Sequence, residues 1–508
     1  METGRTEMGY QMTKMKMIQA LLLMLATMPL AALETPEELL ALKLKTQLLT
    51  QTTGTMTGEG VAWHAAWRST DFVRFARQTH DVAYLEAGAQ YFDALIAKLH
   101  TSPDGWRGWV GPFIYDESVV GDVHVGDAIL VNPMLEWVEN VRALPPHLRQ
   151  PLDDRATQYI ELAEHICSKW LDRGTWWESG HAGGYITWDQ FLSPDDLDQF
   201  QQRDDVRTAR LGLQFNKQQS MGIVHLRLYR LTGGEEHRRK AQLIFQHARS
   251  RLTLFEGHYT WNYWEPLYPG DVVDADGAQL NLWVATHPGR NYQNGEVSEF
   301  VEAFHSGIVF SVADMRRLVR TNWRMWNGDR QDPAFANSDV AVTQAADPSY
   351  QFPDRSGQGR AGALWGALVE FDSTLAAVSH REATNTTFQR RYDLPITEFD
   401  WPHTPSKYFS MVSVLPPSAA HGEKRYLVSK ARIPGNLRIV LTDGTGEREL
   451  IEIYAGLTPG GVDGREGVLV REWEGDTEPG AYRMRWIFTD EQNLTEVRDY
   501  PLSVTDSQ

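Results

Sequence analysis

Apolar residues recur at three- and four-residue spacing from Val61 to about Ala383, in runs long enough for helices. The pattern predicts helices at residues 70–78, 81–99, 127–142, 152–172, 214–231, 236–254, 297–325 and 363–380. Pro145-Pro146 and Gly233-Gly234 separate neighbouring helices, which indicates antiparallel helical hairpins. Strands do not alternate with these helices, so the pattern disfavours a doubly wound sheet.

The pattern changes to period two after about Pro402. Segments such as Leu437–Leu441 and Tyr482–Trp486 alternate apolar and polar residues, and turn residues such as Asp443-Gly444 separate them. We expect residues 423–508 to form a C-terminal antiparallel β-sandwich domain.

Three long segments join one predicted hairpin to the next: residues 101–126, 173–213 and 256–295. Long ordered loops in compact domains are usually functional. In a ring of hairpins such links fall on one rim, and these three hold most of the unusual polar and aromatic residues. We therefore expect a single active-site cleft on that rim.

The first 33 residues have the features of a signal peptide. Lys14 and Lys16 precede an apolar run from Met17 to about Met28, and Ala31-Ala32 follow it. An uncleaved membrane anchor or a buried helix is the alternative. The expected order is a signal peptide at 1–33, a helical catalytic domain at 34–400 and the sandwich, in an exported protein that is periplasmic or secreted.

Composition narrows the partners. There are 67 acidic and 49 basic residues, a net charge of −18, which argues against nucleic acid or an anionic membrane as the partner. The chain contains 18 Trp, whose faces stack on sugar rings as well as building cores. Cys167 is the only cysteine, so it cannot form an internal disulfide, and we expect a buried, inert thiol.

The first two links contain several candidate site residues. Glycines flank His124, which lets a ligand approach; Asp127 is expected to cap a helix, and Asp122, His124 and Asp127 form a weak candidate metal site. At the end of the second link, Asn216 either caps a helix or directs its amide at a substrate.

The third link is the richest in reactive residues. His287, Arg290, Asn291 and Tyr292 stand within six residues, where Arg binds carboxylates and Tyr and His move protons. The alternative is a structural role, in which these polar side chains hydrogen-bond buried backbone groups at the rim. In the next helix Glu296, Glu299, Glu302 and His305 recur every three residues, which we interpret mainly as a solvated or rim-facing stripe and secondarily as a metal site.

With its helical hairpins, aromatic loops and β-rich tail, the chain resembles the (α/α)-toroid carbohydrate-active enzymes, both polysaccharide lyases and uronide hydrolases. The resemblance covers residues 60–400 and implies a mainly α fold, an incomplete (α/α) toroid followed by the sandwich. In such lyases an Asn, Arg or His neutralises the uronate carboxylate while Tyr or His transfers protons, and no cofactor or metal is needed.

The resemblance thus implies a polysaccharide lyase that cleaves a uronate-containing polysaccharide or oligosaccharide by β-elimination. The expected catalytic residues are His287, Tyr292, Tyr263, Asn216, Arg290 and His124. The expected substrate-binding residues are Trp109, His181, Trp188, Trp261, Trp264, Asn291 and Glu299.

Two other functions stay open. A glycoside hydrolase needs two carboxylates across the scissile bond, and Glu178, Asp189, Glu265 and Glu299 are available. A non-catalytic glycan-binding protein would keep the tryptophans without needing the His-Arg-Tyr cluster.

Overall fold

The structure is a computed structural model of the chain, and it describes the parts of the chain that form the elements below. The described residues are 58–102, 104–112, 120–186, 212–264, 266–267, 269–271, 290–324, 365–375, 409–416, 418–431, 435–443, 446–453, 468–474 and 477–506. The predicted signal peptide lies outside them. Within the described residues, no helix combines the length and apolarity needed to cross a membrane.

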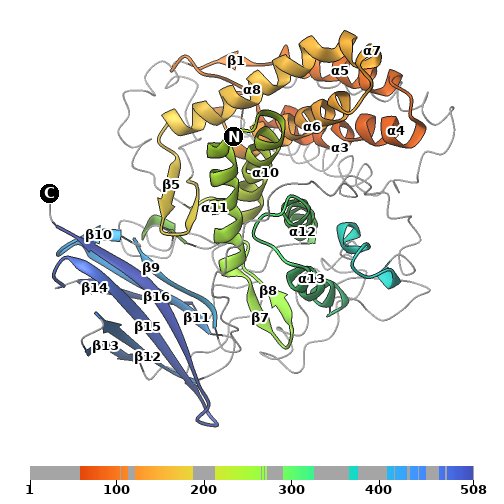
Figure 1. Ribbon diagram of the computed structural model, residues 1–508. Coiled ribbons are helices and arrows are strands. Elements are labelled where there is room, and N and C mark those ends of the chain that lie inside the picture. The colour runs from red at the N-terminus through yellow and green to blue at the C-terminus, as the bar shows by residue number, and fades with distance from the viewer. Residues whose placement is uncertain are drawn as a thin grey trace, which may run out of the picture.

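The N-terminal part is helical, as predicted (Figure 1). Its helices are α3 (Glu59–Ser69), α4 (Asp71–Thr79), α5 (Ala83–Ile96), α6 (His124–Arg142), α7 (Pro146–Arg149), α8 (Asp153–Asp172), α10 (Phe215–Thr232), α11 (Glu235–Arg251), α12 (Arg290–His305) and α13 (Val312–Arg324). Short 3-10 turns η2 (Gln150–Leu152), η5 (Pro269–Asp271) and η6 (Gly366–Leu368) accompany them.

Helices α6 and α10 are the innermost of this part. α6 packs against α3, α8 and α10, whereas α10 packs against α6, α11 and α12. Apolar side chains surround both helices, so each is buried on almost every side. The hairpins α6/α8 and α10/α11 therefore place one helix inside and its partner outside.

Two helix predictions are wrong. The pattern at 297–325 belongs to two helices, because α12 ends at His305 and the chain turns through Gly307, whose φ of 70° suits glycine, before α13 begins. Over residues 365–375, the predicted helix at 363–380 is instead the 3-10 turn η6 and a run of turns, with α-helical backbone only at residues 374 and 375. The sequence pattern did not predict α3 at all.

Short hairpins occupy parts of the predicted links. They are β1 (His100–Thr101) with β2 (Arg107–Gly108), β3 (Gly111–Pro112) with β4 (Val120–Gly121), β5 (Trp176–Ser179) with β6 (Ala182–Tyr185), and β7 (Thr253–Phe255) with β8 (His258–Thr260). The antiparallel pairs satisfy backbone groups that a long loop would leave exposed.

The C-terminal part is rich in sheet (Figure 1). Its strands are β9 (Phe409–Leu415), β10 (Ser418–Ala420), β11 (Lys424–Ala431), β12 (Gly435–Thr442), β13 (Glu447–Ile453), β14 (Val468–Glu474), β15 (Gly480–Asp490) and β16 (Thr495–Thr505). A five-stranded sheet has the order β10-β16-β15-β12-β13, and a three-stranded sheet has the order β14-β11-β9. The β10–β16 pair is parallel, which departs from the fully antiparallel expectation.

Both sheets contribute to one core. Val414 and Leu427 from the small sheet pack in the same buried cluster as Ile439, Met484 and Trp486 from the large one. Because apolar and polar residues alternate along each strand, the apolar side chains lie on one face of it. The strands begin at Phe409, before the predicted boundary at residue 423.

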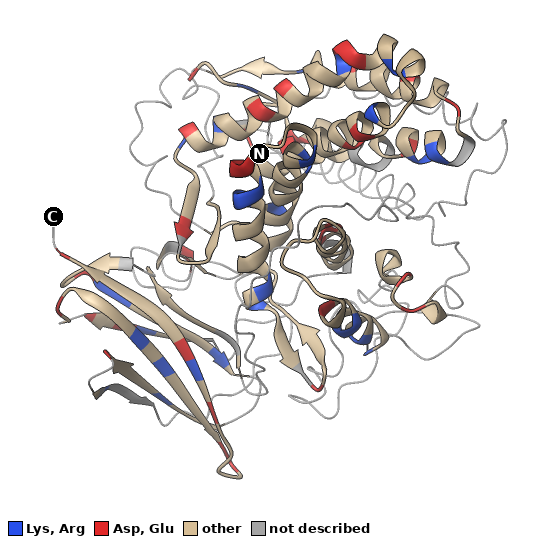
Figure 2. Cartoon of the chain, viewed as in Figure 1, with Lys and Arg blue, Asp and Glu red and all other residues tan. Residues whose placement is uncertain are grey.

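The two parts of the chain touch through a small apolar cluster. Tyr263 and Trp264, which follow the β7–β8 hairpin, pack against Leu415 and Val428 of the small sheet. In Figure 2 acidic and basic residues occur in both parts of the described chain, interspersed along the helices and strands.

Candidate functional site

The first turns of three helices and the second turn of α12 come together at one end of the helical part. Lys217 of α10 lies close enough to Glu59 of α3 and to His124 of α6 to influence the pKa of each. The neighbouring Asn216 directs its backbone N–H at Glu296 of α12. We call Glu59, Asn132, Asn216, Lys217, Ser220, Glu296 and Glu299 the inner cluster.

Glu296 is the most buried carboxyl of the inner cluster, with no exposed surface. Its Oε2 accepts a hydrogen bond from Nε1 of Trp261 over 2.6 Å. Burial raises the pKa of Glu296 to about 8, while the Trp261 indole and the Asn216 backbone N–H act in the opposite direction. Glu296 is therefore largely protonated at neutral pH, which is the state a proton donor needs.

Glu299 lies one turn further along α12. Its Oε1 accepts a hydrogen bond from Oγ of Ser220 over 2.6 Å, and Nδ2 of Asn132 donates to the backbone oxygen of Ser220 over 2.9 Å. Burial raises the pKa of Glu299 well above its ordinary range, and the charges of Glu296 and Glu302 raise it further. These contacts join α6, α10 and α12.

Glu59 has a different environment from Glu296. Nε1 of Trp63 donates to its Oε1 over 2.8 Å, and the ammonium group of Lys217 lies nearby. The pKa of Glu59 is raised from its ordinary value, because the effect of burial exceeds the opposing effects of the Trp63 hydrogen bond and the Lys217 charge. Burial lowers the pKa of Lys217, and Glu59 raises it. Glu59 and Glu299 each have a nearby cation that favours the ionised form, Lys217 and Arg227 respectively.

Hydrogen-bond acceptors without partners gather in the inner cluster. Within the inner cluster, the buried side-chain oxygens without a hydrogen-bond partner are Oε2 of Glu59, Oδ1 of Asn132, Oδ1 of Asn216, Oε1 of Glu296 and Oε2 of Glu299. Buried polar atoms are normally hydrogen-bonded, so each group needs an explanation. The two amide oxygens can only accept hydrogen bonds, whereas Oε1 of Glu296 and Oε2 of Glu299 can donate when these carboxyls are protonated. The set suits a ligand that both donates and accepts hydrogen bonds.

His124 lies at the start of α6, with its ring stacked on Trp170 at 3.6 Å between centroids. Its Nε2 lies 3.2 Å from Oγ1 of Thr175. Burial is the main reason that the pKa of His124 falls well below its usual value, with Lys169 adding to the effect. His124 is thus a neutral, packed ring next to the inner cluster.

The predicted roles of Asp122 and Asp127 are wrong. α6 begins at His124 with Val123 as its N-cap, so Asp127 is inside the helix and caps nothing. Nζ of Lys169 lies 2.9 Å from Asp122 and 2.7 Å from Asp127, in the position that a metal ion shared by these carboxylates would take. Arg173 adds a second cation to Asp122 at 2.7 Å.

Several predicted substrate-binding tryptophans are core residues. Trp109 is buried and donates from Nε1 to the backbone oxygen of Leu95 over 2.9 Å. Trp264 is buried against the small sheet together with Tyr263, which had been expected to transfer protons. Trp261 is buried and supports Glu296. None of these rings presents the open face that stacking on a sugar requires.

The remaining predicted residues fall into four groups. Asn216 and Glu299 belong to the inner cluster, and His181 is exposed at the turn between β5 and β6. Arg290, Asn291 and Tyr292 are the first residues of α12 by their backbone, but their side chains lie outside the described part. His287, Trp188, Asp189 and Glu265 lie outside the described residues.

The carboxylate stripe of α12 is buried, which corrects the expectation of a solvated face. Glu302 is 2 % exposed and forms a bidentate pair with Arg227, with Nε–Oε1 at 2.8 Å and Nη2–Oε2 at 2.9 Å. Nη2 of Arg230 adds a third contact at 2.8 Å. Glu302 therefore ties α12 to α10. Glu296 is not among the predicted site residues, although the regular spacing of the stripe is the signal that could have identified it.

Sequence reasoning missed Glu59, Lys217 and Glu296 as site residues. The exposed Glu178, a predicted hydrolase carboxylate, pairs instead with Arg239 on α11 at 2.9 Å. A second group of potential ligands, Cys167, His225 and His237, lies between α8, α10 and α11.

Comparisons with known proteins give one kind of match. No family model matches the chain, and no curated protein matches it. Among solved structures, an inactive variant of an α-1,6-mannanase, GH76A of Salegentibacter sp. HEL1_6, in complex with α-1,6-mannotriose, is similar at 15 % identity and a TM-score of 0.33. The match covers 68 % of this chain and 83 % of that one.

Proposed function

We propose that the chain is a glycoside hydrolase that acts on a neutral, hydroxyl-rich glycan, within an incomplete (α/α) toroid. Glu296 is the general acid and Glu59 the ionised partner carboxylate. The observation that carries the proposal is a difference between two buried carboxyls that each accept a hydrogen bond from an indole N–H. The ammonium group of Lys217 additionally favours the ionised form of Glu59, whereas burial raises the pKa of Glu296 to about 8.

Glycoside hydrolysis needs this asymmetry. One carboxyl must hold a proton at neutral pH to protonate the leaving oxygen, and the other must be ionised to activate water or attack the sugar. The raised pKa of Glu296, about 8, suits the first role. The neighbouring Lys217 suits Glu59 to the second. Because Asn216 and Lys217 are consecutive, one helix end positions both carboxyls.

The unpartnered atoms support a neutral substrate over a uronate. Sugar hydroxyls donate hydrogen bonds, and the inner cluster offers Oδ1 of Asn132 and of Asn216 as acceptors beside its carboxyls. A uronate lyase needs preorganised donors at the substrate carboxylate instead. In the described part of the inner cluster, Lys217 is the cation that could bind a substrate carboxylate. The charge of Glu59 already acts on Lys217, so Lys217 has an anionic partner within the protein. We therefore favour hydrolysis over β-elimination.

The test incubates the purified full chain with a panel of neutral glycans and a panel of uronate polymers. Hydrolysis releases reducing ends without a new double bond, whereas elimination produces absorbance near about 235 nm. We expect reducing ends from a neutral glycan only. Absorbance that rises on a uronate polymer would overturn the proposal in favour of a lyase.

Three matched variants assign the roles. Glu296→Gln and Glu59→Gln should each lower turnover by about 10²-fold or more, because each removes one proton-transfer or charge-stabilising group. Glu178→Gln, at an exposed carboxylate paired with Arg239, is the control and should retain activity. Full activity in a folded Glu296→Gln protein would reject the assignment. Binding of a glycan without turnover in the unmodified protein would instead favour the non-catalytic glycan-binding function.

A further inference from the structure

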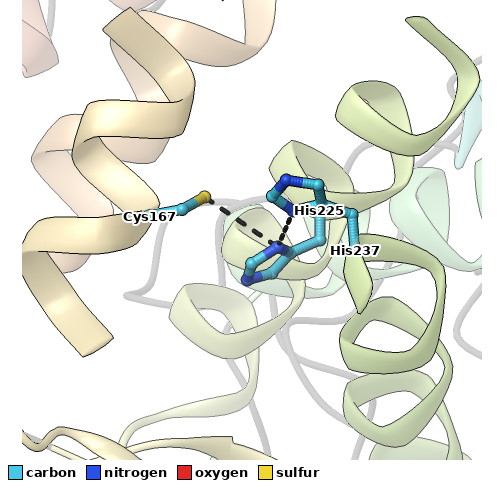
Figure 3. A group of neighbouring side chains, drawn as sticks. All are labelled: Cys167, His225 and His237. Atoms are coloured by element: carbon cyan, nitrogen blue, oxygen red, sulfur yellow. Dashed lines mark hydrogen bonds between the residues drawn. The ribbon is translucent and has the colours of Figure 1, made fainter. Parts of the chain in front are cut away.

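Cys167 of α8, His225 of α10 and His237 of α11 converge between three helices (Figure 3). Nδ1 of His225 lies 2.8 Å from Nδ1 of His237 and 3.9 Å from Sγ of Cys167. The three potential ligand atoms all lie within 4.8 Å of one another. Cys167 and His225 are buried, and His237 is partly exposed at the start of α11.

The outer nitrogens of both histidines are held by second residues. Nε2 of His237 lies 2.8 Å from Oε2 of Glu164, and Nε2 of His225 lies 2.6 Å from Oη of Tyr185. When each Nε2 carries the proton and donates outward, each Nδ1 presents a lone pair to the other histidine and to the thiol. Ligand histidines in metal sites are oriented in this way by a carboxylate or another oxygen.

We propose that Cys167, His225 and His237 bind a zinc ion through Sγ and the two Nδ1 atoms. Thiolate and imidazole are the ligands zinc prefers in proteins. Tetrahedral bonds of ordinary length would set the two nitrogens about 3.3 Å apart and the sulfur about 3.6 Å from each. The observed separations of 2.8 Å and 3.9 Å differ from these by amounts that small side-chain rotations cover.

The charges in the site balance when zinc is bound. The cation brings two positive charges, the Cys167 thiolate one negative charge, and the Glu164 carboxylate behind His237 a second. The Cys167 thiol loses its proton to solvent in this step, and no electron is transferred. Lys240, whose charge acts on His225 and Cys167, already pairs with Glu236 at 2.7 Å.

A hydrogen-bond relay without metal is the competing state. Tyr185 would donate to Nε2 of His225, whose Nδ1–H donates to His237, which in turn donates to Glu164. This relay also satisfies both rings, but it gives the Cys167 sulfur only a weak contact at 3.9 Å. The two states differ in whether the sulfur is a thiolate, and that difference can be measured.

The zinc ligands and the inner cluster share no residue. His225 and Asn216 lie nine residues apart on α10, about 2.5 turns, and so face opposite sides of the helix. The zinc site would fix α8, α10 and α11 to one another on the side away from Glu296. Loss of zinc should therefore lower thermal stability before it affects turnover, and the failure of one proposal leaves the other standing.

The experiment uses the untagged full chain, stripped of metal by a chelator, and titrates it with Co²⁺ and then with Zn²⁺. We expect one equivalent of Co²⁺ to produce a near-ultraviolet thiolate-to-cobalt band that Zn²⁺ abolishes, release of about one proton per zinc, and a higher melting temperature. Absence of the thiolate band in the folded, unmodified chain would overturn the proposal and leave the relay.

Variants then locate the site. Cys167→Ala should remove the thiolate band, and His237→Gln, at the partly exposed ligand, should weaken zinc binding by about 10-fold or more. His165→Gln is the control, because His165 lies on α8 but its ring packs at a tilt against Trp106 instead of joining the three ligands. Unchanged one-to-one zinc binding in folded Cys167→Ala and His237→Gln proteins would also overturn the proposal.

Discussion

Nε1 of Trp261 donates to Oε2 of Glu296 over 2.6 Å, and both side chains are buried. An indole N–H directed at a carboxyl in a dry environment partly offsets the effect of burial on its pKa. The result is a glutamate whose pKa, about 8, lies close to neutral pH. A tryptophan expected to stack on sugar thus acts on the proton of the proposed general acid.

Replacing Trp261 with Phe should shift the pH dependence of turnover. The loss of the N–H donor removes an interaction that favours the charged carboxylate, so the pKa of Glu296 should rise above about 8. The alkaline limb of kcat/KM against pH should therefore move to higher pH. Trp63→Phe, which removes the donor to Glu59, is the matched comparison and should act on the acid limb. An alkaline limb that stays in place would contradict this role of Trp261.

Glu296 should also make stability depend on pH. Its pKa is 4.5 in the unfolded chain and about 8 in the folded protein, so between these values the folded state binds the extra proton. The stability contributed by protonated Glu296 is complete below pH 4.5 and is lost as pH rises to about 8.

Urea denaturation at a series of pH values measures this effect. Glu296→Gln, which cannot titrate, should show a shallower loss of stability across the same range and should gain relative to the unmodified chain at the alkaline end. Parallel curves for the two proteins would show that the folded pKa of Glu296 is not raised.

The buried ion pairs of Glu302 should matter far more than exposed ones. Arg227→Met removes the cation shared by the buried carboxylates of Glu302 and Glu136, which then keep only Arg230 and Arg77 respectively. It should destabilise the protein by up to about 3–5 kcal/mol. Arg239→Ala breaks an exposed pair with Glu178 and should cost at most about 1 kcal/mol. The midpoints of urea unfolding measure both. Similar losses in the two variants would contradict the structural role given to Glu302.

Two glycines, both with positive φ, allow the cost of a steric clash to be compared with the cost of backbone strain alone. Gly58 has a φ of 63°, and a Cβ there would lie 2.8 Å from backbone atoms of Gly111. Gly105 has a φ of 83° but has nothing within 4 Å of a Cβ. Gly105→Ala should therefore cost only roughly 1–2 kcal/mol of left-handed backbone strain.

Gly58→Ala should cost more and should also lower turnover, because the backbone must move directly before Glu59. Urea midpoints and initial rates for the two variants provide the comparison. Equal losses of stability, with activity unaffected in both, would show that the contact between residues 58 and 111 does not hold Glu59 in place.

The sequence by itself determined the local elements. Three- and four-residue spacing located α8 and α10 to within a residue or two, and period-two alternation located the strands of the C-terminal part, because each depends on neighbours a few residues apart. The same spacing runs on across Ser306–Ser311, where the turn at Gly307 divides one apolar pattern into α12 and α13. The spacing of apolar residues alone does not predict that the helix ends there.

Only the tertiary structure decided which side chains meet. Asn216 and Glu299 were candidates from their sequence context, but Glu59 acquires its significance from Lys217, which lies 158 residues later in the chain (217 minus 59). Cys167 becomes a potential ligand only because α8 packs beside the helices that carry His225 and His237. Trp109, Trp261 and Trp264 have the same chemistry whether exposed or buried, and helix and sheet packing buried all three. Spacing along the chain fixes each helix, whereas the packing of helices against one another fixes the pKa and the partners of every carboxyl between them.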